Sequence, residues 1–130
     1  MNLIAKDAMN IERIAEGHVD ETIEQATQPV VIDFWMDNCP PCNMMAPKLK
    51  AVANAYEGRV KVYQVKVEES SALLTQYDVE TMPTILFFSE GALVKRVEAL
   101  VSFSGLERAF EEVTSAEAPV GAGTSNQRIN

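Results

Sequence analysis

Residues 32–42 read Ile-Asp-Phe-Trp-Met-Asp-Asn-Cys-Pro-Pro-Cys, and this segment is the most informative part of the chain. It holds both cysteines of the chain, Cys39 and Cys42, in a C-x-x-C spacing. An apolar run precedes Cys39 and a stretch with helical periodicity follows it. Because backbone N–H groups and the helix dipole favour negative charge at a helix start, we expect the Cys39 thiol to ionise readily. Cys42 lies close enough to close a disulfide with it, and C-x-x-C beside a βαβ pattern is typical of a redox motif.

Two alternatives to a redox pair stay open from the residues alone. The cysteines could be half of a zinc site or two inert core residues. A structural zinc ion takes four ligands, mostly Cys and His, whereas this chain has two cysteines and one distant histidine, His18. We therefore predict no metal site and no bound cofactor, and we expect His18 to be a surface residue before the first helix.

Composition favours one globular domain and excludes several partners. The chain has 130 residues, of which 47% are hydrophobic, enough for a single core. Nineteen acidic against eleven basic residues give a net charge of −8, which argues against nucleic acid and anionic membrane surfaces. No stretch approaches the roughly 20 apolar residues of a membrane span, and the first residues do not resemble a secretory signal. We expect a bacterial-type or organellar reducing compartment, most simply the cytoplasm, because two cysteines in one motif are not a disulfide scaffold.

Apolar periodicity predicts secondary structure in the order βαβαβαββα. The near-continuous β-branched and aromatic run at 30–35 indicates a central strand buried on both faces. Pro40 suits the first position of the helix that follows, and Pro47 should bend that helix. The last helix should begin at a capping box, Ser104–Glu107. The predicted strands are 11–14, 30–35, 60–67, 84–88 and 93–97, and the predicted helices are 20–27, 39–56, 71–77 and the one from 104.

This order predicts an α/β fold in which a central mixed β-sheet has helices on both faces. Ligands of such sheets bind at the carboxyl ends of strands, and Cys39 falls at that edge. We assign residues 11–115 to the domain and 1–10 to an N-terminal extension. The tail 116–130, rich in Ala, Gly, Ser and Asn, is expected to be disordered.

Asp33 is a carboxylate inside an otherwise apolar strand. Burying it is costly without a partner or a task, and desolvation should raise its pKa, which suits a proton acceptor near neutral pH. Alternatively, Asp33 faces solvent or accepts a bond from a nearby backbone N–H. Lys66, at the end of the neighbouring strand, is the natural partner charge for Asp33, unless it is a solvated surface lysine. Trp35 could be a core residue without a further role.

Several motifs together resemble the thioredoxin family. They keep the family's order and approximate spacing from about 29 to 113, and their joint occurrence is specific although each alone is weak. The resemblance implies the thioredoxin fold and dithiol–disulfide exchange. The motifs are Asp33-Phe34-Trp35, Cys39-x-x-Cys42, Met44-Met45-Ala46-Pro47, Lys66, Met82-Pro83-Thr84 and the hairpin at Gly91.

By this resemblance, Cys39 attacks a substrate disulfide and Cys42 resolves the mixed disulfide. Asp33 would be the buried base and Lys66 would tune it. The resemblance further implies a docking surface for an extended substrate segment, in which Pro83 is cis, the Met82 backbone pairs with substrate and Trp35 packs under the active-site loop. The residues implied in substrate binding are Trp35, Asn38, Pro40, Pro41, Thr81, Met82, Pro83 and Glu98.

The chain departs from the family's usual pattern around the cysteines. Asn38 replaces a tryptophan, Pro40 a glycine and Asn43 a lysine, while Thr81 and Glu98 replace small residues. Because Asn38, Thr81 and Glu98 should surround Cys39, the choice of docking partner should change. The implied partners are disulfide-containing proteins and a reductase of the thioredoxin-reductase type, acting on a monomer. Alternatives are a dedicated partner reductase or isomerase, or a non-catalytic binding subunit with this fold.

The Pro40-Pro41 pair has a consequence for the redox potential. Proline has no N–H, so the first-turn donors that can bond the Cys39 thiolate begin at Cys42. We hypothesise that the thiolate is less stabilised than in a Gly-Pro active site and that the disulfide is harder to reduce. Strain from the stiffer Pro-Pro geometry would oppose this effect.

Overall fold

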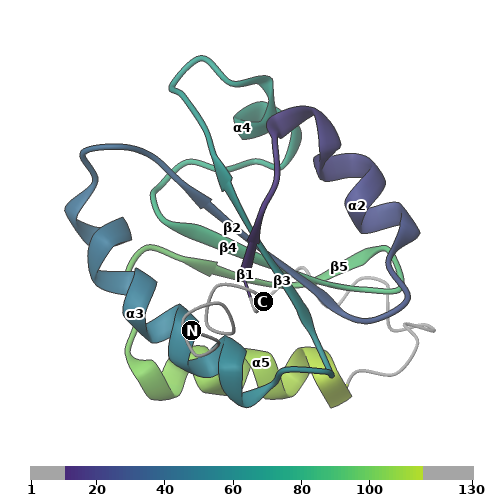
Figure 1. Cartoon of the computed structure of the whole chain (residues 1–130). Coiled ribbons are helices and arrows are strands. Elements are labelled where there is room, and N and C mark those ends of the chain that lie inside the picture. Colours follow the sequence, from purple (N-terminus) through teal and green to yellow (C-terminus); the bar gives the residue numbers. More distant parts are fainter. Residues whose placement is uncertain (1–10, 116–130) are drawn as a thin grey trace, which may run out of the picture.

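The computed structural model describes residues 11–115 (Figure 1). The predicted N-terminal extension and the predicted disordered tail lie outside the described residues. The elements, in chain order, are β1 (Ile11–Arg13), the 3-10 turn η1 (Glu16–His18), α2 (Val19–Gln25), β2 (Val30–Trp35), α3 (Pro40–Ala55), β3 (Lys61–Lys66), α4 (Ala72–Gln76), β4 (Thr84–Ser89), β5 (Ala92–Glu98) and α5 (Phe103–Ser115).

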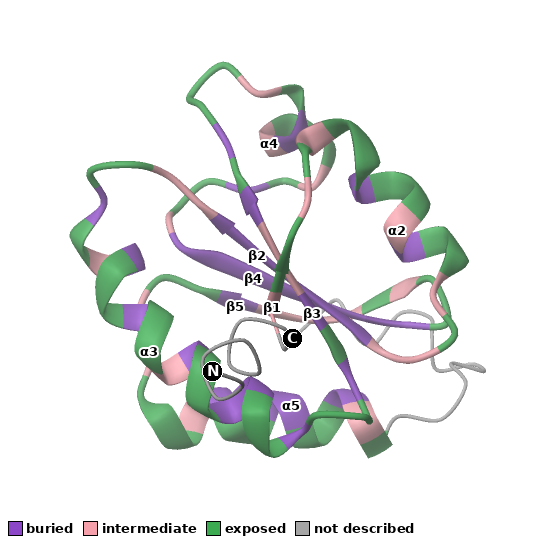
Figure 2. Ribbon diagram, in the orientation of Figure 1, coloured by how far each residue is buried: buried purple, intermediate pink, exposed green. Residues whose placement is uncertain are grey.

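The five strands form one mixed sheet in the order β1-β3-β2-β4-β5. Strands β1, β3 and β2 run parallel, whereas β4 is antiparallel to both β2 and β5. Strand β2 is therefore central, and its residues from Val30 to Phe34 are all buried, as Figure 2 shows for the middle of the sheet. The predicted α/β class and the central position of this strand are confirmed.

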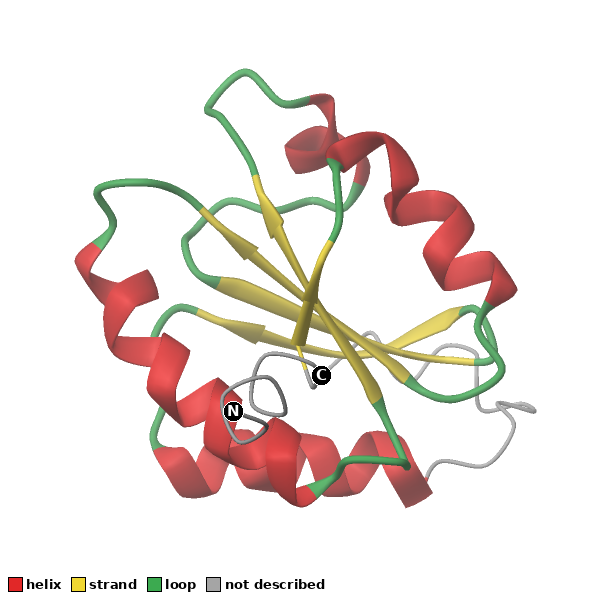
Figure 3. Ribbon diagram, in the orientation of Figure 1, coloured by secondary structure: helices red, strands yellow, loops and turns green. Residues whose placement is uncertain are grey.

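Helices cover both faces of the sheet (Figure 3). Helices α3 and α5 lie against one face, and α2 and α4 against the other. Because side chains alternate along a strand, β2 supplies Val31 to the α3/α5 core and Ile32 and Phe34 to the α2/α4 core. Asp33 follows the alternation of Val31, so it points to the same side as α3.

The start of the last helix was predicted wrongly. The expected capping box at Ser104 is not the cap, because α5 begins at Phe103 and the Ser102 hydroxyl accepts the Gly105 backbone N–H at 3.0 Å. A capping side chain accepts the backbone N–H two or three residues later in the chain. Ser102 meets this requirement, because Gly105 is three residues further on. The inward face is as predicted, since Leu106, Phe110 and Val113 are all buried.

Two smaller differences concern η1 and α3. The 3-10 turn η1 before α2 was not predicted, and it carries the exposed His18 where a surface histidine was expected. Helix α3 continues through Pro47 to Ala55, as its apolar periodicity indicates, and the bend expected at Pro47 stays a prediction.

Ala99, in the turn after β5, has a left-handed backbone with φ of 67°. Its N–H donates to the Pro83 carbonyl at 2.8 Å, which ties this turn to the start of β4. For a residue with a Cβ this conformation costs about 1–2 kcal/mol, which glycine avoids at an entropic cost of about 0.5–1 kcal/mol. The surrounding turn therefore holds Ala99 in an unfavourable conformation.

Replacing Ala99 with glycine should therefore raise the free energy of unfolding by about 0.5–1 kcal/mol in urea denaturation. Ala92→Gly is the matched control, because Ala92 lies in β5 and has no strain to relieve; it should destabilise. If both variants destabilise equally, the strain at Ala99 is not real.

Candidate active site

The cysteine pair lies where β2 passes into α3. Cys39 is the N-cap of α3, and its sulfur accepts the Cys42 backbone N–H at 3.2 Å. Pro40 and Pro41 occupy the first helical positions, so the first N–H that reaches the sulfur comes from Cys42, as predicted. The two sulfurs form a disulfide, with 5.2 Å between the Cα atoms. Cys39 and Cys42 are 9% and 6% exposed, so Cys42 is the slightly more shielded thiol, as expected.

The two residues before Cys39 form an exposed turn. Asn38 has a left-handed backbone with φ of 54°, a conformation in which asparagine is favoured over most residues. Its presence therefore has a backbone reason beside the docking role that the resemblance implies. Pro40 is exposed and Pro41 half-buried, so Asn38 and Pro40 are open to a partner.

Asp33 is buried, with 4% of its surface exposed, which excludes the solvent-facing alternative. The Gln64 side-chain amide donates to Oδ2 at 3.2 Å, while Oδ1 is buried and has no hydrogen-bond partner within residues 11–115. Burial raises the pKa of the Asp33 carboxyl to about 6, opposed by the bond from Gln64. The expected rise of this pKa is confirmed, and its role as a base stays a prediction.

The expected pairing of Lys66 with Asp33 is wrong. The Lys66 ammonium bonds the Asp37 carboxylate at 2.8 Å, and both side chains are exposed. The register explains this, because Trp35 is paired with Lys66 while Asp33 is paired with Gln64. The hydrogen bond to Asp37, and then its charge, raise the pKa of Lys66.

Gln64 is the site residue that sequence reasoning missed. Its signal was present, because Gln64 alternates with Val62 and is a polar residue on the core-facing side of a predicted strand. The parallel register that places it beside Asp33 belongs to the sheet and not to the local sequence.

Trp35 is half-buried at the end of β2. The Lys66 ammonium lies 6.0 Å from the centre of its ring, within the range of a cation–π contact. The indole Nε1 is buried and lacks a partner in the described part of the chain. Trp35 therefore lies beside the Lys66 ammonium instead of lying wholly in the core.

The Met82-Pro83 bond is cis, as the resemblance implies. Pro83 is buried, Met82 half-buried and Thr81 exposed. Because β4 is antiparallel to β2 and Thr84 is paired with Phe34, this cis bond lies at the edge where β2 ends and the cysteine loop begins.

Glu98 lies at the same edge. It is opposite Thr84 in the sheet, is exposed, and accepts a bond from Arg96 at 3.0 Å. The sheet thus brings Asn38, Thr81 and Glu98 to one edge, as the docking hypothesis requires. Their part in binding a substrate stays a prediction.

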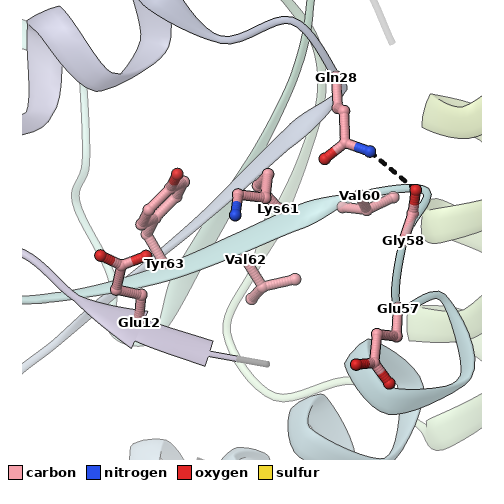
Figure 4. Close-up of a pocket in the computed structure, with 8 residues that line it drawn as sticks. All are labelled: Glu12, Gln28, Glu57, Gly58, Val60, Lys61, Val62 and Tyr63. Atoms are coloured by element: carbon pink, nitrogen blue, oxygen red, sulfur yellow. Dashed lines mark hydrogen bonds between the residues drawn. The ribbon is translucent and has the colours of Figure 1, made fainter. Parts of the chain in front are cut away.

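A hollow at the start of β3 lies away from the cysteines. This pocket of about 260 Å³ (Figure 4) is where Gln28 bonds the Gly58 carbonyl at 2.8 Å. Since β2 and β3 are parallel, the start of β3 is opposite the end of β2 that carries Cys39. The pocket contains no cysteine. Its lining residues are Glu12, Gln28, Glu57, Gly58, Val60, Lys61, Val62 and Tyr63.

Metal binding and membrane crossing find no support within residues 11–115. No cluster of three or more His, Cys, Asp or Glu side chains there could hold a metal ion. No helix in that range combines the length and the apolarity that a membrane crossing requires.

Three features define a thiol-redox fold of the thioredoxin type. They are the disulfide at the start of a helix, the buried carboxyl on the central strand and the cis-proline at the same sheet edge. A sequence profile of the Thioredoxin family matches residues 10–112, and the chain belongs to this family.

Individual relatives are similar to this chain at moderate identity. An M-type chloroplastic thioredoxin of Pisum sativum is 36% identical over 90 residues, covering 68% of this chain and 52% of that protein. An M-type chloroplastic thioredoxin of Spinacia oleracea is 30% identical, with 81% and 58% covered. Thioredoxin 1 of Nostoc sp. is 30% identical, with 77% and 94% covered. The chain thus spans little more than half the length of the two plant relatives.

The raised pKa of Asp33 predicts a fall in stability with pH. The ordinary value is 3.8 and the folded value about 6, so the folded state holds the proton more tightly. As pH rises through this window, the free energy of unfolding falls by about 3 kcal/mol and then levels off. Asp33→Asn should abolish this fall and be the more stable protein at pH 7.

The measurement is urea denaturation of the oxidised protein between pH 3.5 and 7.5. Asp78→Asn is the control, because Asp78 is exposed, and it should leave the fall in place. A wild-type fall that persists in Asp33→Asn would mean that other groups cause it.

Proposed function

We propose that this protein is a thiol–disulfide oxidoreductase that reduces protein disulfides through a reversible Cys39–Cys42 pair. The observation that carries the proposal is the disulfide at the N-terminus of α3, with Cys39 as the N-cap. This position favours a thiolate at Cys39. Cys42 is close enough to attack the mixed disulfide that forms between Cys39 and a substrate. Membership of the thioredoxin family supports the same activity.

The exchange begins with both cysteines reduced. The Cys39 thiolate attacks one sulfur of a substrate disulfide, forms a mixed disulfide and releases the other sulfur as a thiolate that takes a proton from water. Cys42 then loses its proton to Asp33 and attacks the Cys39 sulfur. This expels the second substrate sulfur as a thiolate, which takes the proton back from Asp33 through water, and it oxidises the pair to the disulfide of the structure, so that two electrons pass to the substrate.

Asp33 is suited to the proton step. With a pKa of about 6, its carboxyl is mostly ionised at pH 7 and only slightly too weak a base to hold a proton there. No bound cofactor enters these steps. The pair must be reduced again by an external donor, which we take to be a reductase of the thioredoxin-reductase type.

The remaining partners and the location follow from the same chemistry. The substrates would be proteins with accessible disulfides, and the enzyme would act as a monomer. A reducing compartment is required to keep the cysteine pair in its dithiol form, and we propose that this compartment is the cytoplasm. Cell fractionation with an antibody to the protein would overturn this if the protein were found elsewhere, for example in an organelle.

A second candidate is a reductase or isomerase dedicated to one partner. The observation that favours it is the exposed rim of Asn38, Thr81 and Glu98, where Glu98 is bonded to Arg96. A third candidate, a non-catalytic binding subunit, would keep its partner when the thiols are removed. The Cys39→Ser variant distinguishes this third candidate from the other two. A non-catalytic binding subunit would still bind its partner and keep its function, whereas an oxidoreductase would lose its activity.

Reduction of insulin disulfides tests the general activity. With dithiothreitol as donor, the wild type should accelerate insulin precipitation, and Cys39→Ser should reduce the rate at least ~100-fold because the thiol that attacks the substrate is lost. Cys42→Ser should instead accumulate a mixed disulfide on Cys39 that mass spectrometry identifies. Absence of such a species would exclude the exchange mechanism, and slow insulin reduction alongside efficient trapping of one protein would favour the dedicated candidate.

The Pro40-Pro41 pair should affect the redox potential of the Cys39–Cys42 disulfide. Pro40→Gly restores a first-turn N–H that can favour the Cys39 thiolate, so the reduced form should gain stability and the potential should rise by about 10–20 mV. Equilibration with glutathione buffers measures this shift. Pro47→Ala is the control, because Pro47 is exposed and lies two turns further along α3. A fall in potential would show that relief of Pro-Pro strain dominates.

A further inference from the structure

Asp33 lies on one rung of the sheet with a neutral neighbour on each side. Its partner on β3 is Gln64 and its partner on β4 is Ile85. One strand further out, Arg13 of β1 is paired with Gln64. Residues on one rung point to the same face, so Gln64 stands between the buried carboxyl and the nearest cation on its rung.

In the described part of the chain, no cation of the surrounding elements is paired with Asp33. Lys66 of β3 bonds Asp37, and Lys48 of α3, one of the two helices that cover this face, donates to the Val101 carbonyl at 2.9 Å. Arg13 is exposed, and β4 carries no charged residue. Cys42 of α3 and its N-cap Cys39 are joined in the disulfide. The remaining charged residues of the two helices on this face are exposed: Lys50 of α3, and Glu107, Arg108, Glu111 and Glu112 of α5. Within residues 11–115, Asp33 has no ion-pair partner, and its side-chain bond comes from Gln64 alone.

We propose that Gln64 is a positioning residue, whose amide holds Asp33 Oδ2 and leaves Oδ1 as the oxygen that exchanges a proton with Cys42. This inference rests on the proposed thiol–disulfide function and names the residue that adjusts its proton step. Oδ1 is buried without a partner in the described structure, and such an atom is costly unless a proton or a water serves it during the reaction.

The chemistry of the amide explains why a glutamine suits this place. The amide stays neutral at every pH, so its bond favours the ionised carboxyl without cancelling the charge. A cation in its place would favour the carboxylate strongly and weaken it as a base. An apolar residue would leave both oxygens without partners and keep the carboxyl protonated. Gln64 therefore holds the proton affinity of Asp33 between these limits.

The test replaces Gln64 in two opposite ways and follows Asp33 directly. Carbon-13 NMR of the side-chain carboxyl in the oxidised protein should show the Asp33 midpoint about one pH unit higher in Gln64→Leu and about one unit lower in Gln64→Lys. Gln76→Leu is the matched control, because it removes an amide bond to a carboxylate, that of Asp20 at 2.7 Å, at an exposed place. It should leave the Asp33 midpoint unchanged.

A second readout links the midpoint to the reaction. The rate at which Cys42 resolves a preformed mixed disulfide on Cys39, measured in single turnovers across pH, should move its midpoint in the same directions. If Gln64 had a merely structural role, its replacement would change the size of the rate or of the NMR signal. It would not move the midpoint up in Gln64→Leu and down in Gln64→Lys. Midpoints that stay in place in both variants, or that shift in the same direction, would overturn the proposal. So would an NMR midpoint that shifts while the rate profile does not.

Failure of the function itself is measured separately. If wild-type protein does not reduce insulin faster than Cys39→Ser, the proposed activity fails, whatever the Gln64 variants show. If the wild type reduces insulin and the Asp33 midpoint is indifferent to residue 64, the activity stands and the positioning role is lost.

Discussion

The structure depends on a central strand that is buried on both faces and yet carries an acid. Strand β2 pairs with β3 and β4 along its length, so its direction and register are set from both sides. Its carboxyl end delivers Cys39 to the start of α3, and its interior holds Asp33 under that helix. The same pairing brings the cis-proline turn of β4 to the cysteine edge. The cysteine pair, the acid and the cis-proline turn are therefore arranged by one strand.

Burial of Asp33 is unfavourable for folding and useful for chemistry. Desolvation moves its pKa to about 6, into the range where a carboxyl can accept and return a proton near neutral pH. The fold can bear an ionised carboxyl here because the apolar cores on the two faces of the sheet bury large side chains such as Phe34, Phe87 and Phe110. The stability that these cores supply thus offsets the cost of a reactive group.

The charges around the cysteine edge are paired at the surface and not with the buried acid. Lys66 bonds Asp37 and lies over Trp35, and Glu98 bonds Arg96. Exposed pairs of this kind add little to stability, about 0–1 kcal/mol, but they set the pattern of charge at this edge of the sheet. This separation leaves the proton affinity of Asp33 to burial and to one neutral amide.

The amino-acid sequence was enough to predict the fold class, most element bounds and the cysteine pair at a helix start, and it favoured burial of Asp33 while leaving a solvent-facing side chain open. These follow from periodicity along the chain and from the helix-starting position of Cys39, which are local properties. The side chain that reaches Asp33 became clear from the arrangement of the strands in the sheet. Lys66 was expected because opposite charges attract, but the register of β2 and β3 places Gln64 beside the acid and Lys66 beside Trp35. Register arises from the packing of all strands together, so no local stretch of sequence specifies it.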